Sequence, residues 1–206
     1  MEILLETLFT SELAQFMLED IDLSSIVPHV LDMEKKSKGT LKSNAGGYQS
    51  DVKFRNNYDY YLTGICFEEY IIPALDNIAN QWGLPKAYNL SYWYNINRKF
   101  NYNHSHYHPG SALSGVLYLK VPENSGNLVF QRSFSDADRM DFLTEYQISS
   151  GEHFDDNPNT NVMCWRKPDP YRVFVFQGFQ EHYVGQNLTD DCDDIRISIS
   201  FNYFYK

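Results

Sequence analysis

The second half of the chain alternates short apolar runs with polar and turn-forming residues. After about residue 88, β-branched and aromatic residues gather in short runs that are separated by Gly, Pro, Asn and Asp. This pattern is typical of an antiparallel β sandwich or barrel, in which strands are short and turns are frequent. We expect strands at Tyr88–Asn97, Ala112–Val121, Asn127–Gln131, Arg172–Gln177 and Ile195–Tyr205, with a further strand around Tyr183.

The last of these runs shows the alternation most clearly. Successive side chains of a strand point to opposite faces, so every second residue shares a face. One face of this strand is apolar and predicts core, whereas the other is either a solvated surface or the lining of a site. The apolar face carries Ile195, Ile197, Ile199 and Phe201, and the polar face carries Arg196, Ser198, Ser200 and Asn202.

The first third of the chain has a helical pattern instead. A helix is predicted at Ser24–Lys38, because serine caps stand at its start and Gly39 follows its basic last turn. A second helical stripe covers Tyr58–Trp82, where Pro73 must kink or divide the helix. Its apolar positions are Tyr61, Leu62, Ile65, Phe67, Tyr70, Ile71, Leu75 and Ile78.

These elements predict a mainly β protein with N-terminal helices. No internal repeat, low-complexity tract or linker divides the 206 residues, so we expect one domain over residues 1–206. In this interpretation residues 1–87 form a mostly helical annex, and residues 88–206 form the β core on which the helices pack.

Charge and composition exclude several classes of function. The chain has 27 acidic and 17 basic residues, a net charge of -10, and no cluster of Lys and Arg. It therefore lacks the electrostatic footprint of a protein that grips phosphate backbones, and we expect no nucleic-acid partner. No apolar run is long enough to span a bilayer, and the first residues carry no basic segment of a signal peptide.

The cysteines indicate a reducing compartment. Cys66, Cys164 and Cys192 are widely separated and odd in number, which suits a cytoplasmic protein better than a disulfide framework. We therefore expect a soluble, cytoplasmic protein without a membrane partner. Its oligomeric state is left open by the sequence.

Four of the six histidines fall in two places. His104, His106 and His108 lie within five residues of one another, and His182 follows some seventy residues later. On an extended strand, residues two apart share a face at about 6.6 Å, so their imidazoles can converge on one ion while a distant strand adds a third ligand. Three ligands leave positions open for substrate, as in a catalytic metal site. The alternative is a solvated histidine-rich turn.

Several motifs together resemble one known family over nearly the whole chain and in the same order. They resemble the 2-oxoglutarate and Fe(II)-dependent oxygenase family that is common in marine phages and bacteria, and the H-x-H-P-G-S-x-L-S-G stretch is their most specific part. The motifs are Ser43–Ser50, Trp93–Asn95, His106–Tyr118, and His182 with Arg196–Asn202.

This resemblance implies a double-stranded β-helix, a cupin-like jelly roll whose mouth holds iron. It implies that His106 is the first ligand, that His108 occupies the position usually taken by a carboxylate, and that His182 is the distal ligand. His108 departs from the wider pattern and leaves one more unit of positive charge on the metal unit. A register shift of two residues would place His104 instead of His106 as the first ligand.

The resemblance also assigns residues to the cosubstrate. Arg196 and Ser198 match the R-x-S element that holds the distal carboxylate of 2-oxoglutarate. A buried Arg is costly unless an anion pairs with it, and its planar guanidinium can meet a carboxylate with two hydrogen bonds. Tyr118 shares strand parity with Ser114 and can donate its hydroxyl to the same carboxylate. Asn95 and Asn202 are expected to line the pocket or to be ordinary structural amides.

Two further segments have alternative interpretations. The polar stretch Asp155–Pro170 is long for a compact domain, and it is either a lid that carries Trp165 and Arg166 or a plain surface excursion. Gly46–Ser50 belongs to the family pattern, and its glycines predict a tight turn close to the β core.

The resulting hypothesis is a 2-oxoglutarate- and Fe(II)-dependent dioxygenase that uses O2 and hydroxylates a C–H bond of a peptide or small-molecule substrate. The cosubstrate would leave as succinate and carbon dioxide. If the protein is encoded by a phage, its compartment would be the host cytoplasm. The alternatives are a cupin-like three-histidine metalloprotein that does not use 2-oxoglutarate, and a non-enzymatic jelly-roll binding or structural protein.

Overall fold

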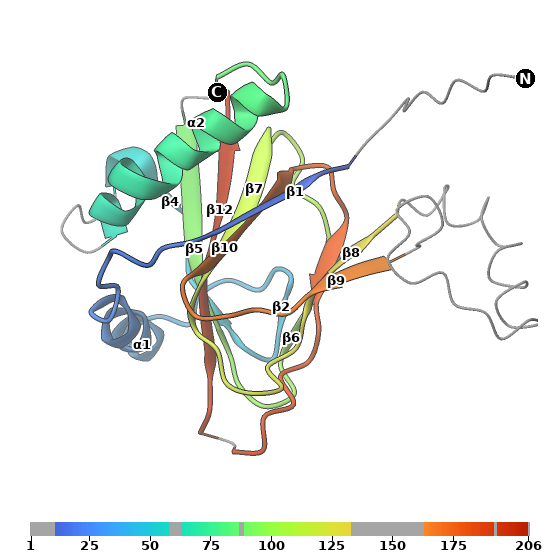
Figure 1. The fold of residues 1–206 in the computed structure, drawn as a ribbon. Helices are drawn as coiled ribbons and strands as arrows, with labels where there is room; N and C mark the ends of the chain where they lie inside the picture. The colour runs from blue at the N-terminus through green and yellow to red at the C-terminus, as the bar shows by residue number, and fades with distance from the viewer. Residues whose placement is uncertain (1–10, 58–62, 87–88, 133–162, 192, 206) are drawn as a thin grey trace, which may run out of the picture.

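The structure is a computed structural model, which describes residues 11–57, 63–86, 89–132, 163–191 and 193–205. Within these residues the chain forms two antiparallel sheets (Figure 1). The larger sheet has the order β1 (Leu13–Met17), β10 (Arg172–Gln177), β7 (Leu113–Lys120), β12 (Arg196–Phe204), β5 (Asn89–Asn97) and β3 (Tyr48–Gln49), with β4 (Lys53–Phe54) also paired to β5. The smaller sheet has the order β2 (Asn44–Ala45), β6 (Tyr102–His106), β11 (His182–Val184), β8 (Leu128–Gln131) and β9 (Met163–Arg166).

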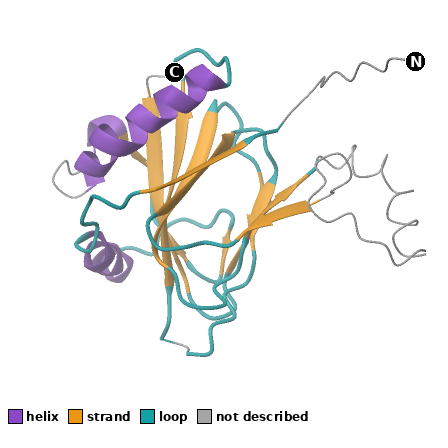
Figure 2. Ribbon diagram, in the orientation of Figure 1, coloured by secondary structure: helices purple, strands orange, loops and turns teal. Residues whose placement is uncertain are grey.

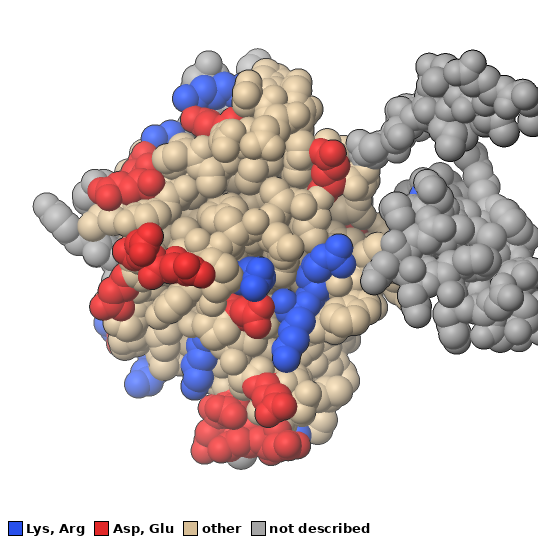
Figure 3. All heavy atoms as spheres, in the orientation of Figure 1, with Lys and Arg blue, Asp and Glu red and all other residues tan. Residues whose placement is uncertain are grey.

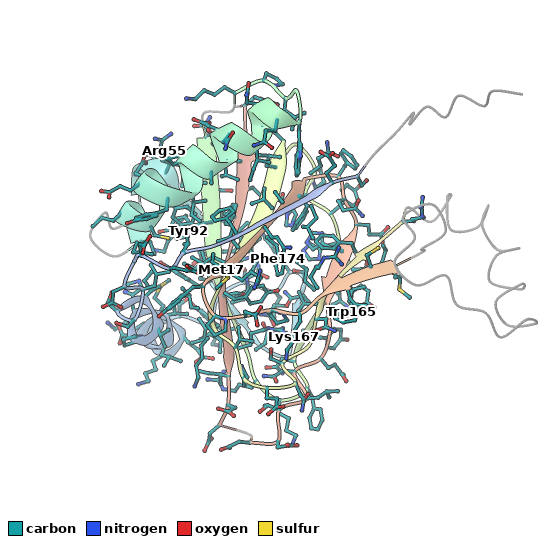
Figure 4. The ribbon with its side chains drawn as sticks, viewed as in Figure 1. Met17, Arg55, Tyr92, Trp165, Lys167 and Phe174 are labelled. Atoms are coloured by element: carbon teal, nitrogen blue, oxygen red, sulfur yellow. The ribbon has the colours of Figure 1, made fainter. Side chains whose placement is uncertain are left out.

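The two sheets face each other across a small aromatic core. Phe174 of β10, labelled in Figure 4, and Tyr118 of β7 belong to the same buried cluster as Leu128 and Phe130 of β8. Side chains of one sheet thus pack directly against those of the other, as in a jelly roll. The expected mainly β fold with N-terminal helices is confirmed.

The helices cover the outer face of the larger sheet (Figure 2). They are α1 (Ile26–Lys36), a 3-10 turn η1 (Arg55–Asn57), a π-helix η3 (Cys66–Ile71) and α2 (Ile72–Gln81). Pro73 lies in the first turn of α2, where a backbone N–H would have no partner within the helix. The π-helix ends and α2 begins next to Pro73, at the place where the sequence predicts a division. No helix in the described part of the chain is long and apolar enough to cross a membrane.

The two faces of strand β12 have different environments, as the alternation of its residues predicts. Ile197, Ile199 and Phe201 are fully buried in the core that the helices share with the larger sheet. Arg196 and Ser198 point to the opposite face, toward the smaller sheet, and line a cavity there. The polar face of this strand is therefore the wall of a cavity and not a solvated surface.

Six strands of the described residues were not among the runs predicted as strands: β1, β2, β3, β4, β6 and β9. Strand β1 pairs with β10 at the edge of the larger sheet, within the segment predicted to be mostly helical. Strand β9 pairs with β8, so the prediction of a loop is wrong for Met163–Arg166, where backbone pairing extends the smaller sheet. Trp165 and Arg166 belong to this edge strand. Residues 58–62, 87–88, 133–162 and Cys192, on which parts of other predictions fall, lie outside the described residues.

Charged side chains are mixed on the face shown in Figure 3. Basic side chains stand among acidic ones there, and the group of charges at the bottom of the view is acidic. The acidic group agrees with the net charge of -10 of the chain.

Candidate metal centre

The two sheets bring three histidines together at one end of the space between them. His106 is the last residue of β6, His182 is the first residue of β11, and these two residues are paired in the antiparallel ladder. His108 follows His106 by two residues. One ring nitrogen from each histidine lies within 4.8 Å of those of the other two, a separation at which a single cation can bind all three.

Backbone carbonyls fix the rings of two of these histidines. Nδ1 of His106 lies 2.7 Å from the carbonyl oxygen of His104, and Nδ1 of His182 lies 2.9 Å from that of Gln180. A carbonyl oxygen only accepts, so each Nδ1 carries the hydrogen and donates it. The lone pair is then on Nε2, as a metal ligand requires.

His108 is held from two other sides. Its backbone N–H donates to the carbonyl oxygen of Gly178 at 2.7 Å, which ties the segment after β6 to the segment before β11. Its ring lies against the indole of Trp93, with ring centroids 5.6 Å apart. This contact places an aromatic wall directly beside the three histidines.

All three imidazoles are in the form that binds a metal. Burial, together with the proximity of the other histidines, lowers the pKa of His108 to about 3 and that of His182 to about 4. Burial also lowers the pKa of His106. Each ring is therefore neutral at pH 7, with a lone pair free for coordination.

A β-bulge decides between His104 and His106. Val184 pairs with Asn103 and His182 with His106, so one residue of β11 faces two residues of β6. The extra residue shifts the alternation, and Asn103 and His106 both line the cavity between the sheets. His104 is exposed and lines a shallow pocket elsewhere on the smaller sheet. The expectation that His104 shares the face of His106 is therefore wrong.

The same cavity contains a buried arginine without an anionic partner. Arg196 is 1% exposed, and its Nη1 donates to the backbone carbonyls of Ser125, Gly126 and Gly185. Its Nη2 is buried and has no hydrogen-bond partner, and no carboxylate of the described residues lies within ion-pair distance. Burial lowers the pKa of Arg196 to about 10, so it is still charged at pH 7.

Tyr118 completes this polar end of the cavity. Its hydroxyl is buried without a hydrogen-bond partner, and burial raises its pKa to about 12 although nearby Arg196 acts to lower it. Ser198 is paired with Tyr118 on one side and with Asn95 on the other. The three inward-facing residues thus form a row across β7, β12 and β5.

The residues fit a metal ion and a dicarboxylic acid. None of the residues that line the cavity is Asp or Glu. Leaving the Nη2 of Arg196 and the hydroxyl of Tyr118 unpaired in a buried site costs free energy, and a carboxylate would satisfy both. The histidines supply a separate site for a cation in the same cavity.

The remaining predicted residues fall in different places. Asn95 lines the cavity, and its Nδ2 donates to Ser200 Oγ at 3.0 Å. Asn202 does not line it and instead accepts a hydrogen bond of 2.9 Å from Ser114. Sequence reasoning did not identify Asn97 and Asn103 as lining residues. Asn97 lies two residues after Asn95 on the same strand and therefore shares its face, and this signal could have identified Asn97 as a lining residue.

Comparison with known proteins places these features in context. A family model described as "Putative 2OG-Fe(II) oxygenase" matches residues 91–202. A comparison with curated protein sequences found no match.

Solved structures share the fold at low sequence identity. A prolyl-4-hydroxylase from Pseudomonas putida is 12% identical with a TM-score of 0.59, covering 96% of this chain and 94% of that one. A prolyl hydroxylase from Trichoplax adhaerens, in complex with a hypoxia inducible factor peptide fragment, is 11% identical with a TM-score of 0.60, covering 94% and 83%. The α-ketoglutarate-dependent epimerase SnoN of nogalamycin biosynthesis is 13% identical with a TM-score of 0.60, covering 94% and 78%.

Proposed function

Because the chain belongs to the 2OG-Fe(II) oxygenase family, we propose that it is a hydroxylase that oxidises a C–H bond of a peptide or small-molecule substrate. Fe(II) and 2-oxoglutarate are the cofactors of this family, with O2 as the oxidant. The observation that carries the proposal is one cavity with three neutral histidines and a buried, unpaired Arg196.

The three histidines would hold the iron. His106, His108 and His182 are the only group of three potential ligands among the described residues. Two of their rings are oriented by backbone carbonyls, which reduces the freedom lost when the metal binds. When bound, iron and 2-oxoglutarate supply the oxidising chemistry, in which the cosubstrate becomes succinate and carbon dioxide.

Arg196 and its neighbours would hold the far carboxylate of 2-oxoglutarate. Among the residues that line the cavity, the Nη2 of Arg196 and the hydroxyl of Tyr118 are the two buried donors left without partners, and Ser198 lies in the ladder next to Tyr118. Val116, Leu128 and Phe176 line the same cavity and keep it partly apolar. They exclude water, which strengthens the ion pair between the guanidinium and the carboxylate.

The third histidine changes the charge of the metal unit. With His108 in the usual place of a carboxylate, the three protein ligands are neutral and the bound cation keeps its full charge. A dianionic cosubstrate is then attracted both by the metal and by Arg196. This charge balance supports tight binding of 2-oxoglutarate.

The similar structures support both substrate classes. One of them is a prolyl hydroxylase in complex with a peptide fragment, and another acts in nogalamycin biosynthesis. We infer hydroxylation of a peptide residue or of a small metabolite, with Trp93 as an aromatic surface beside the metal. Cys66 is buried and forms no disulfide, which suits activity in the cytoplasm.

The test is an anaerobic titration of the metal-free protein with Fe(II) and then with 2-oxoglutarate. We expect the visible charge-transfer band of the chelate, and we expect His182→Ala or Arg196→Ala to remove it. Asn77→Ala, on the exposed face of α2, is the control that should keep it. Tight iron binding without the band would favour a cupin-like protein that does not use 2-oxoglutarate, and absence of iron binding would favour a structural jelly roll.

Hydroxylation is tested by its products. The loaded enzyme in air should form succinate faster when the true substrate is present, and the substrate should gain one oxygen atom by mass spectrometry. Succinate formation with a substrate that changes without gaining oxygen would replace hydroxylation by another oxidation of the same family.

A further inference from the structure

A chain of buried side-chain amides crosses one wall of the cavity. Asn44, Asn95, Asn97 and Asn103 are each less than a tenth exposed. Asn97 Nδ2 donates to the Oδ1 of Asn44 at 3.1 Å and to that of Asn103 at 3.5 Å, and Asn44 Nδ2 donates to Asn95 Oδ1 at 3.4 Å. Asn44 therefore joins Asn95 to Asn97, and Asn97 joins both to Asn103.

The short segment from β2 to β3 holds Asn44 in this place. β2 pairs with β6 of the smaller sheet and β3 pairs with β5 of the larger one, so this segment bridges the two sheets. Asn44 Nδ2 also donates to the carbonyl oxygen of Tyr48 at 3.0 Å, across the turn. A Cβ on Gly47 would lie 2.5 Å from Asn44 Oδ1, so glycine is needed for this close approach.

The amide chain links the two halves of the proposed cofactor site. Asn103 precedes His106 by three residues on β6, and Asn97 is paired with Arg196 between β5 and β12. The hydrogen bonds through Asn97 thus tie the strand that carries a metal-binding histidine to the strand next to Arg196. Hydrogen bonds fix distance and direction, which apolar packing does less strictly.

We propose that Asn44 is a positioning residue that sets the distance between the histidines and Arg196. The consequence is selectivity for the length of the cosubstrate, because a 2-oxo dicarboxylic acid must reach from the metal to the guanidinium. Asn44 does not line the cavity, so it acts through Asn95 and Asn97, which do. This inference rests on the proposed function, and it gives the Gly46–Ser50 turn a role.

The experiment compares Asn44→Ala with the wild type and with Asn77→Ala as the control. The dissociation constants of 2-oxoglutarate and of 2-oxoadipate, which is one carbon longer, are measured anaerobically from the chelate band of the Fe(II)-loaded protein. The dissociation constant of the metal alone is measured separately. We expect Asn44→Ala to bind metal within about twofold of the wild type, and to bind 2-oxoglutarate at least tenfold more weakly.

The decisive quantity is the ratio of the two cosubstrate constants. We expect the preference for 2-oxoglutarate over 2-oxoadipate to fall at least threefold in Asn44→Ala and to stay unchanged in Asn77→Ala. An unchanged preference, or a parallel loss of metal and cosubstrate binding, overturns the proposal. If Asn44→Ala does not fold, Asn44→Ser is measured in its place, and failure of both variants to fold overturns the proposal in favour of a purely structural role.

These outcomes are separate from failure of the proposed function. If the wild type shows no chelate band with 2-oxoglutarate, the cosubstrate assignment fails before Asn44 is tested. If the wild type shows the band and Asn44→Ala shows the same preference, only the role of Asn44 fails.

Discussion

The Nη2 of Arg196 and the hydroxyl of Tyr118 are both buried without hydrogen-bond partners, and both face the cavity that contains the three histidines. Native proteins rarely leave such donors unpaired, because each costs roughly 1–3 kcal/mol when desolvated. The pair is therefore better explained by a ligand that accepts from both than by folding alone.

Tyr118→Phe separates binding from stability. The change removes a donor to the cosubstrate, and a hydrogen bond to a charged group contributes about 1.5–3 kcal/mol, so the affinity for 2-oxoglutarate should fall about tenfold or more. It also removes a buried unpaired hydroxyl, so the free energy of unfolding without cosubstrate should stay the same or rise. Titration of the chelate band and urea unfolding measure the two effects. A large loss of stability would show that the hydroxyl has a structural partner.

Arg196→Lys tests whether a positive charge alone is sufficient to bind 2-oxoglutarate. Lysine keeps a positive charge but lacks the planar fork that meets a carboxylate with two hydrogen bonds. We expect the variant to bind iron as the wild type does and to bind 2-oxoglutarate at least tenfold more weakly. Equal cosubstrate affinity in the two proteins would mean that the guanidinium geometry is not used.

Because of the bulge in β6, we expect alanine substitution of His106 and of His104 to have opposite effects on metal binding. His106→Ala should remove the stoichiometric metal site, because its ring lies in the cluster with His108 and His182. His104→Ala should leave one metal ion per chain, because its ring faces away from the cavity. Metal content after dialysis against excess Fe(II) under anaerobic conditions distinguishes them. Loss of metal in His104→Ala alone would reverse the assignment.

Regular alternation explains why part of the fold was predictable. In β12 every second residue from Ile197 to Phe201 is buried under the helices, as the sequence predicts. The inward direction of Tyr118 followed from the same rule. Where the backbone is regular, the period of two is sufficient to sort core residues from site residues.

The features that broke this regularity were not predictable. The bulge between Asn103 and His106 changes which histidine faces the cavity, and it depends on pairing with β11, which is distant in sequence. β1 and β9 are short edge strands without strict alternation, so their pairing partners and not their own patterns make them strands. The amide chain around Asn44 joins three strands, β2, β5 and β6, and only the shared parity of Asn95 and Asn97 gave a local signal.

Burial makes Cys66 unreactive at neutral pH. Burial raises the pKa of its thiol to about 12, whereas an ordinary thiol titrates near 8.5. Only the thiolate reacts, and its fraction grows as pH rises toward the pKa, so at pH 8 about one Cys66 in ten thousand is ionised. We expect iodoacetamide at pH 8 to leave Cys66 unlabelled in the folded protein and to label it in urea, as peptide mass spectrometry would show. Labelling of Cys66 without urea would mean that the helical layer opens readily.

Gly115 and Gly110, both in the histidine motif, should respond differently to alanine. A Cβ on Gly115 would lie 2.4 Å from the ring of Phe201 and 2.6 Å from the carbonyl oxygen of Phe174, so Gly115→Ala should cost roughly 1–3 kcal/mol of unfolding free energy through overpacking. Gly110 has a φ of +82° and open space around its Cβ position, so Gly110→Ala should cost only about 1 kcal/mol, from backbone strain. Urea unfolding of both variants gives the comparison. A smaller loss for Gly115→Ala than for Gly110→Ala would mean that Phe201 can move away, and that the contact between β12 and β7 is looser than the structure shows.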